Sequence, residues 1–162
     1  MKIHSSFWLL GIILSCFIFF SCEKQNQKRP NIVFLLADDL GYNEIGAYGQ
    51  KIIKTPNLDK LAKQSMRYTN FYAGNSVCAP SRAVLLTGVS SANVPIRGNA
   101  GYFGKDDWSP TWLESDTFTL GELFKSAGYQ SAFIGKWHLD NPDDISTWAF
   151  SHSFDFAAQE QW

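Results

Sequence analysis

The stretch Cys78-Ala79-Pro80-Ser81-Arg82, followed by the apolar run Val84-Leu85-Leu86, organises this chain. Pro80 suits the first turn of a helix, because its missing N–H is not needed there and its φ is already helical. The sequence therefore predicts a helix that begins at this cysteine. Free backbone N–H groups at a helix amino terminus favour an anion, and the Arg82 guanidinium adds a cation suited to an oxyanion. A buried cysteine packed beside a helix is the plain alternative.

The composition limits the possible classes of protein. The chain has 162 residues, of which 45% are hydrophobic and 18% charged, with a net charge of −1. This balance is ordinary for a globular protein and supplies no basic field for nucleic acid, and the length allows at most one domain. The three cysteines, at positions 16, 22 and 78, give no disulfide framework.

The amino-terminal residues have the layout of a secretory signal peptide. An apolar run over residues 7–20 ends at Ser21-Cys22. It is shorter than the roughly 20 apolar residues of a spanning helix, so we expect a signal peptide of the lipoprotein type over residues 1–21. Ser21-Cys22 resembles a bacterial lipobox, in which Cys22 becomes the lipidated first residue, although Cys16 is a competing site.

Residues 22–29 are polar and predict a tether between the lipid and the domain. The expected location is therefore outside the cytoplasm, in the bacterial periplasm or at the outer membrane or cell surface, with the membrane reached only through the lipid anchor. An uncleaved amino-terminal anchor is the alternative, and it leads to the same compartment.

A continuous apolar and β-branched run over residues 31–37 is typical of a strand buried on both faces of a parallel sheet. Asp38 and Asp39 follow at its carboxyl end, where open α/β sheets place their ligands. Two adjacent carboxylates there are costly unless a cation compensates them, and a hard divalent cation is the usual solution. A solvated turn that caps a helix is the alternative.

The next segments predict scaffold and a loop. Thr55-Pro56 begins a short helix, and residues 66–73 are predicted to form a second strand that leads into Cys78. Residues 89–115 have little periodicity and predict a long loop. Its tryptophans, Trp108 and Trp112, could stack on a sugar ring or simply cover an edge of the core.

A second group of polar side chains follows a later strand. A helix over residues 119–128 and a strand over residues 129–134 lead to Lys136 and His138. Two residues apart at a strand end, these side chains can supply a cation and a titratable base to one site. His152 has no motif around it and is expected at the surface. Because parallel strands bring their carboxyl ends to one edge, the three groups can meet.

Together these segments resemble the sulfatase family. Cys78-Ala79-Pro80-Ser81-Arg82 is similar to its signature, in which the cysteine is oxidised to formylglycine. The run ending in Asp38-Asp39 resembles its metal-binding opening strand, and Gly135-Lys136-Trp137-His138-Leu139 resembles another block, although Asp140 stands where the family commonly has Gly. The resemblance implies an α/β fold over residues 30–162, the amino-terminal part of an alkaline-phosphatase-like, mostly parallel sheet flanked by helices.

The resemblance also implies a sulfuric ester hydrolase that acts on aryl or glycan sulfates with Ca²⁺ or Mg²⁺. The implied catalytic residues are Cys78 as the formylglycine nucleophile, Arg82, Lys136 and His138. The implied metal ligands are Asp38, Asp39 and Cys78 as formylglycine. The implied partners are a sulfated small molecule or glycan and a maturation enzyme, with no nucleic acid.

Family members are several times longer, so the resemblance implies further metal ligands beyond residue 162. We interpret the sequence as an amino-terminal fragment with an incomplete sheet, inactive on its own. Arg97-Gly98-Asn99 resembles a family segment too short to assign a role. Two alternatives remain open: a phosphonate or phosphodiester hydrolase of the same superfamily, which shares the Cys-x-Pro-x-Arg nucleophile, and a non-catalytic remnant.

Overall fold

A computed structural model of the chain describes residues 28–99 and 112–160. The predicted signal peptide, Cys22, most of the tether and Trp108 lie outside these residues. Within them, no helix combines the length and hydropathy that crossing a membrane requires.

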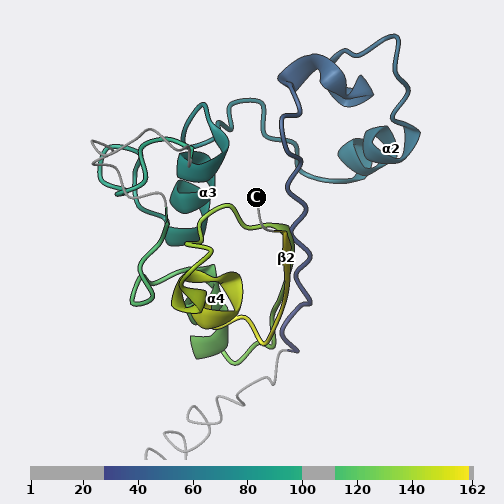
Figure 1. Cartoon of the computed structure of the whole chain (residues 1–162). Coiled ribbons are helices and arrows are strands. Elements are labelled where there is room, and N and C mark those ends of the chain that lie inside the picture. The colour runs from purple at the N-terminus through teal and green to yellow at the C-terminus, as the bar shows by residue number, and fades with distance from the viewer. Residues whose placement is uncertain (1–27, 100–111, 161–162) are drawn as a thin grey trace, which may run out of the picture. The chain divides into compact units, whose positions relative to one another are not determined.

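The described residues form three α-helices, four 3₁₀ turns and two strands (Figure 1). In chain order they are η1 (Tyr42–Glu44), η2 (Gly46–Tyr48), α2 (Pro56–Gln64), α3 (Cys78–Thr87), α4 (Leu120–Ser126), β1 (Ala132–Lys136), η3 (Ile145–Thr147), η4 (Ala149–His152) and β2 (Phe156–Glu160).

The three predicted helices are confirmed, each with a local cause. Helix α2 has Pro56 at its first position, and α3 is followed by the capping residue Gly88, whose φ of 69° is left-handed and favours glycine. Helix α4 carries a capping box: the Thr119 hydroxyl accepts from the Gly121 N–H, and the Glu122 carboxylate accepts from the Thr119 N–H at 2.8 Å. Caps therefore fix where these helices begin and end.

The sheet consists of β1 and β2, which pair in parallel from Ala132 with Phe156 to Lys136 with Glu160. The strand predicted over residues 129–134 thus begins three residues later and includes Lys136. Strand β2 was not predicted, because five residues with alternating exposure give little signal by themselves. Parallel strands together with helices agree with the predicted α/β class.

Two predicted strands are wrong. Residues 31–37 form no strand pairing within the described part of the chain, and their apolar side chains are 51% to 85% exposed at positions 32 to 36. Residues 66–73 also show no strand pairing with any other described residue, and Phe71 and Tyr72 are exposed. A strand is stabilised by its ladder and by cross-strand neighbours, which composition alone does not provide. Residues 28–37 belong to a unit separate from the one that begins at Asp38.

The hydrophobic core of the second unit joins α3 to the segments after residue 90. It consists of Ala79, Ala83, Leu86, Val94, Ile96, Leu113, Trp137, Leu139, Ala149 and Phe154. Trp137 is fully buried, contacts the rings of Phe133 and Phe154, and donates its indole N–H to the Thr147 carbonyl at 3.0 Å. The core therefore binds the helix that begins at Cys78 to the segment that carries Lys136 and His138.

His152 is fully buried, which corrects the expectation that it lies at the surface. Its ring lies 5.5 Å from that of Trp137, and its carbonyl meets the first turn of α4. A Cβ at Gly121 would lie 1.9 Å from the His152 carbonyl oxygen, so only glycine fits there. This contact joins segments far apart in sequence, so no local motif predicts it.

Candidate active site

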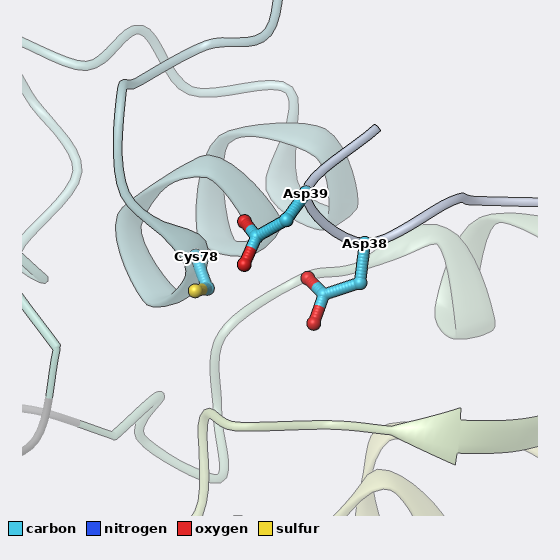
Figure 2. A group of neighbouring side chains, drawn as sticks. All are labelled: Asp38, Asp39 and Cys78. Carbon is cyan, nitrogen blue, oxygen red and sulfur yellow. The ribbon is translucent and has the colours of Figure 1, made fainter. Parts of the chain in front are cut away.

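Asp38, Asp39 and Cys78 meet at the amino terminus of α3. One ligand atom from each residue lies within 4.8 Å of the others. Figure 2 shows the two carboxylates turned toward the side of the helix on which Cys78 lies. Both aspartates are exposed and Cys78 is half-buried, so a small ligand can reach all three.

The backbone beside these groups turns sharply. Asp39 has a φ of 54° and His138 a φ of 59°, both in the left-handed region. This conformation costs a residue other than glycine roughly 1 kcal/mol. Two such residues at one site indicate that the surrounding structure holds their backbones in place.

Asp38 lies between two cations. Its Oδ1 accepts from Arg82 Nη2 at 3.0 Å, and its Oδ2 accepts from Lys136 Nζ at 2.9 Å. The hydrogen bond from Lys136, followed by the one from Arg82, holds the pKa of the Asp38 carboxyl below its ordinary value. The same contact with Asp38 raises the pKa of Lys136. Asp38 is therefore ionised and Lys136 charged at neutral pH.

Arg82 connects α3 to β1. Its side chain is almost fully buried, and Nη1 donates to the Lys136 carbonyl at 2.5 Å. Nε has no hydrogen-bond partner in the described ranges. A buried guanidinium with two fixed acceptors holds its direction, so Arg82 keeps one edge of its fork toward Asp38.

Asp39 differs from its neighbour. The salt bridges found among residues 28–99 and 112–160 do not include it. Its exposed carboxylate thus remains available to a cation, whereas that of Asp38 is shared with Lys136 and Arg82.

His138 is half-buried, and its Nδ1 has no hydrogen-bond partner among the residues described. Burial lowers the pKa of its imidazole, and the nearby charges of Lys136 and Arg82 lower it further. Burial raises the pKa of Asp140, whose negative charge opposes the shift at His138. At neutral pH the imidazole is uncharged and can accept a proton.

A family model for sulfatases matches residues 30–162. The chain belongs to the sulfatase family. It is 37% identical over 136 residues to an arylsulfatase of Hemicentrotus pulcherrimus and 38% identical over 128 residues to an N-acetylglucosamine-6-O-sulfatase of Bacteroides thetaiotaomicron. The matches cover 79% and 78% of this chain but only 24% and 21% of those sulfatases.

Solved sulfatase structures resemble the chain as well. Ps i-CgsB in complex with k-i-k-neocarrahexaose is 32% identical with a TM-score of 0.68, covering 80% of this chain and 28% of that one. BT4656 in complex with its substrate D-glucosamine-2-N,6-O-disulfate is 35% identical with a TM-score of 0.61, covering 80% and 23%. The chain thus has part of the alkaline-phosphatase-like sulfatase fold, as predicted.

The predicted site residues of this sulfatase chain come together in space. The two aspartates, Cys78, Arg82 and Lys136 are linked by contacts of 4.8 Å or less. His138 lies two residues beyond Lys136 and within its electrostatic influence. His152 is turned into the core and does not belong to the group.

One residue that lies beside the sulfatase signature was not predicted to have a role. Asn99 accepts a hydrogen bond from the Ala79 N–H at 3.0 Å, and its amide nitrogen lies 3.7 Å from Cys78 Sγ. The weak resemblance of Arg97-Gly98-Asn99 to a family segment was the only signal. Twenty-one positions separate Asn99 from Cys78, so the contact depends on the loop fold.

Proposed function

We propose that the protein carrying this chain hydrolyses sulfuric esters of glycans, with formylglycine at position 78 as the nucleophile. The observation that carries the proposal is the meeting of two carboxylates with residue 78, their ligand atoms within 4.8 Å, in a member of the sulfatase family. The chain spans about a quarter of the length of the curated relatives it matches, from 21% to 25%. The rest of the site therefore comes from other segments.

Maturation changes the Cys78 side chain from a thiol to an aldehyde. The Cβ–S bond breaks, water supplies the aldehyde oxygen, sulfur leaves as sulfide, and two electrons pass to an acceptor used by the maturation enzyme. Addition of water to the aldehyde then gives two hydroxyls on one carbon. In the unmodified chain, Sγ stands in for one of these oxygens.

The donor set fits a hard divalent cation. Two carboxylates from one short turn and an oxygen on residue 78 are the ligands that Ca²⁺ and Mg²⁺ prefer. Asp38, Asp39 and residue 78 would hold such a cation, and it would supply Lewis acidity there. Calcium takes about six to eight oxygen ligands, so other residues must complete the set.

The charged side chains then have distinct tasks. Arg82, fixed by Asp38 and the Lys136 carbonyl, orients residue 78, and Lys136 donates to a sulfate oxygen as negative charge builds. A hydroxyl of residue 78 attacks sulfur, the S–O bond to the substrate breaks, and the alcohol leaves with a proton. His138 takes the proton of the second hydroxyl, so that the aldehyde re-forms and sulfate departs.

The structural relatives favour glycan esters. The substrate of BT4656 is a sulfated glucosamine, and another relative is an N-acetylglucosamine-6-O-sulfatase. Trp112 is half-buried, so part of its side chain is open to contact with a sugar ring.

The test uses the protein expressed from its complete reading frame together with a maturation enzyme. Peptide mass spectrometry should find formylglycine at position 78, and the product should release sulfate from D-glucosamine 6-sulfate. Cys78→Ala should abolish turnover, whereas Asn93→Ala, an exposed loop change, should not. Intact thiol at Cys78 in the matured protein, or turnover that survives Cys78→Ala, would contradict the proposal. Faster cleavage of a phosphonate monoester than of any sulfate would favour that reaction instead.

Export with lipidation at Cys22 is the second part of the proposal. Labelling with a fatty-acid analogue should be lost in Cys22→Ala and kept in Cys16→Ala. The opposite pattern would move the cleavage site to Cys16, and labelling of neither parent nor variants would leave an ordinary signal peptide.

A further inference from the structure

Asn99 links two consecutive residues at the start of α3. Its Oδ1 accepts from the Ala79 N–H at 3.0 Å, and its Nδ2 donates to Cys78 Sγ at 3.7 Å. The amide orientation follows from chemistry, because a backbone N–H can only donate and must therefore face the oxygen. The side-chain N–H₂ is then left for the sulfur.

The contact with Ala79 satisfies one of the helix N–H groups that have no partner within the helix. The residue before α3, Val77, supplies no side-chain cap, so Asn99 acts as a cap from another segment. It holds the first turn of the helix, and with it the backbone of residue 78.

The loop that carries Asn99 is itself anchored. Val94 and Ile96 are buried in the core. The two terminal nitrogens of the Arg97 guanidinium donate to the carbonyls of Ser91 and Ala92 at 2.7 and 2.8 Å. Side chains at three of the five preceding positions thus anchor the loop that carries the exposed Asn99.

A second asparagine ties the other side of the helix start to the same loop. Asn75 Oδ1 accepts from the Ser76 N–H at 2.7 Å, and Asn75 Nδ2 donates to the Ser91 hydroxyl at 2.9 Å. The segment before Cys78 and the loop with Asn99 are therefore joined by hydrogen bonds through Ser91.

We propose that Asn99 is a positioning residue for the nucleophile: its carbonyl oxygen fixes the Ala79 N–H, and its amide N–H₂ orients the atom attached to Cβ of residue 78. This inference rests on the proposed function. In the matured protein the amide donates to a hydrate oxygen in the place of Sγ and leaves the other hydroxyl free for the proton transfer to His138.

Three variants of the protein from its complete reading frame separate the two halves of the contact. Asn99→Asp keeps an acceptor for Ala79 but loses the donor to residue 78. Asn99→Ala loses both, and Asn93→Ala is the matched control on the same loop. Formylglycine content is measured in each, and kcat is normalised to it.

Hydrogen exchange at the Ala79 amide is the readout that does not depend on turnover. The exchange rate should increase about five- to tenfold in Asn99→Ala, which corresponds to the loss of one hydrogen bond. It should stay unchanged in Asn99→Asp and Asn93→Ala. An unchanged rate in Asn99→Ala would overturn the proposal, whether or not the protein hydrolyses sulfate esters.

Measurements of kcat and KM distinguish a positioning role of Asn99 from a role in helix capping alone. The kcat should fall about five- to tenfold or more in both Asn99→Asp and Asn99→Ala, with a smaller change in KM. Full kcat in Asn99→Asp, or loss only through KM, would show that Asn99 does no more than cap the helix. If the parent protein cleaves no sulfate ester, the proposed function fails, while the Ala79 exchange still decides whether Asn99 holds the helix start.

Discussion

Lys136 Nζ lies 2.9 Å from Asp38 Oδ2, although 98 positions separate the two residues in the sequence. Asp38 is therefore already compensated by a cation of the protein itself, and Arg82 adds a second. A divalent cation must compete with these two for the same carboxylate, whereas Asp39 offers its oxygens without such competition.

Replacing either aspartate should weaken calcium binding. Asp39→Asn removes a carboxylate that forms no salt bridge within the described residues, so we expect at least about a tenfold loss of affinity. Isothermal titration calorimetry on the matured protein checks this. The exposed Asp143→Asn is the matched control, and an equal loss in that variant would mean that only net charge matters.

Lys136→Gln should have the opposite effect on the cation. Removing a positive charge beside Asp38 should strengthen calcium binding several-fold or more, because two like charges about 4 Å apart repel each other by roughly 1 kcal/mol even in bulk water and by more near a protein surface. Turnover should fall in the same variant, since Lys136 is the proposed donor to a sulfate oxygen. Lys125→Gln, on the exposed face of α4, should change neither quantity. Weaker calcium binding in Lys136→Gln would contradict the inference that Lys136 and the divalent cation compete for the Asp38 carboxylate.

The acid limb of the kcat profile should reflect His138. Its folded pKa lies below 6.5 because of burial and the neighbouring cations, so the uncharged base persists below that pH. Asp140 raises that pKa, and Asp140→Asn should therefore move the limb to lower pH. Rates measured between pH 4.5 and 8, about the range in which a shifted histidine titrates, check this. A limb that moves upward would exclude His138 as its origin.

Acidification should destabilise the fold through His152. Burial lowers the pKa of this imidazole, while the charge of Glu122 and the backbone of Thr117 oppose the shift. The unfolded chain then binds more protons, so stability is lost as pH falls below 6.5 toward the folded pKa. In urea unfolding experiments, His152→Phe should reduce the dependence of the unfolding free energy on pH. An unchanged pH dependence would mean that other groups cause it.

Gly121→Ala should destabilise the protein although alanine favours helices. The added Cβ would lie 1.9 Å from a backbone oxygen of His152, which no side-chain movement can relieve. We expect a loss of about 1–3 kcal/mol, the usual cost of overpacking. Gly98→Ala, where a Cβ meets open space, serves as the control in urea unfolding. Equal stability of the two variants would contradict the close contact.

Local signals predicted the helices of this sulfatase chain. Each helix start depends on residues within one turn of it, and the structure has a helix at each predicted place, beginning at Pro56, at Cys78 and just after Thr119. Strands depend on partners distant in sequence. For that reason the prediction of a paired strand over the apolar residues 31–37 is wrong, and the short β2 is not predicted.

The candidate site was predictable as a set of residue types but not as a geometry. The prediction relied on parallel strand ends to bring Asp38 and Cys78 together. In the structure Asp38 and Asp39 follow an unpaired segment and lie near Cys78 nonetheless. The ion pairs through Arg82 and Lys136 make this link, and Asn99 joins from a loop. Side-chain contacts between residues so far apart leave no periodic pattern in the sequence, so the sequence does not predict them.

The burial of Trp137 has a genetic consequence. Its indole lies wholly inside, bonded to the Thr147 carbonyl, while its neighbours Lys136 and His138 on either side remain partly open to solvent. A smaller residue at 137 would loosen both neighbours without touching any substrate. Substitutions there should therefore behave as temperature-sensitive alleles, active in cool culture and inactive in warm culture, and a screen for lost activity would recover them alongside changes in the chemical groups themselves.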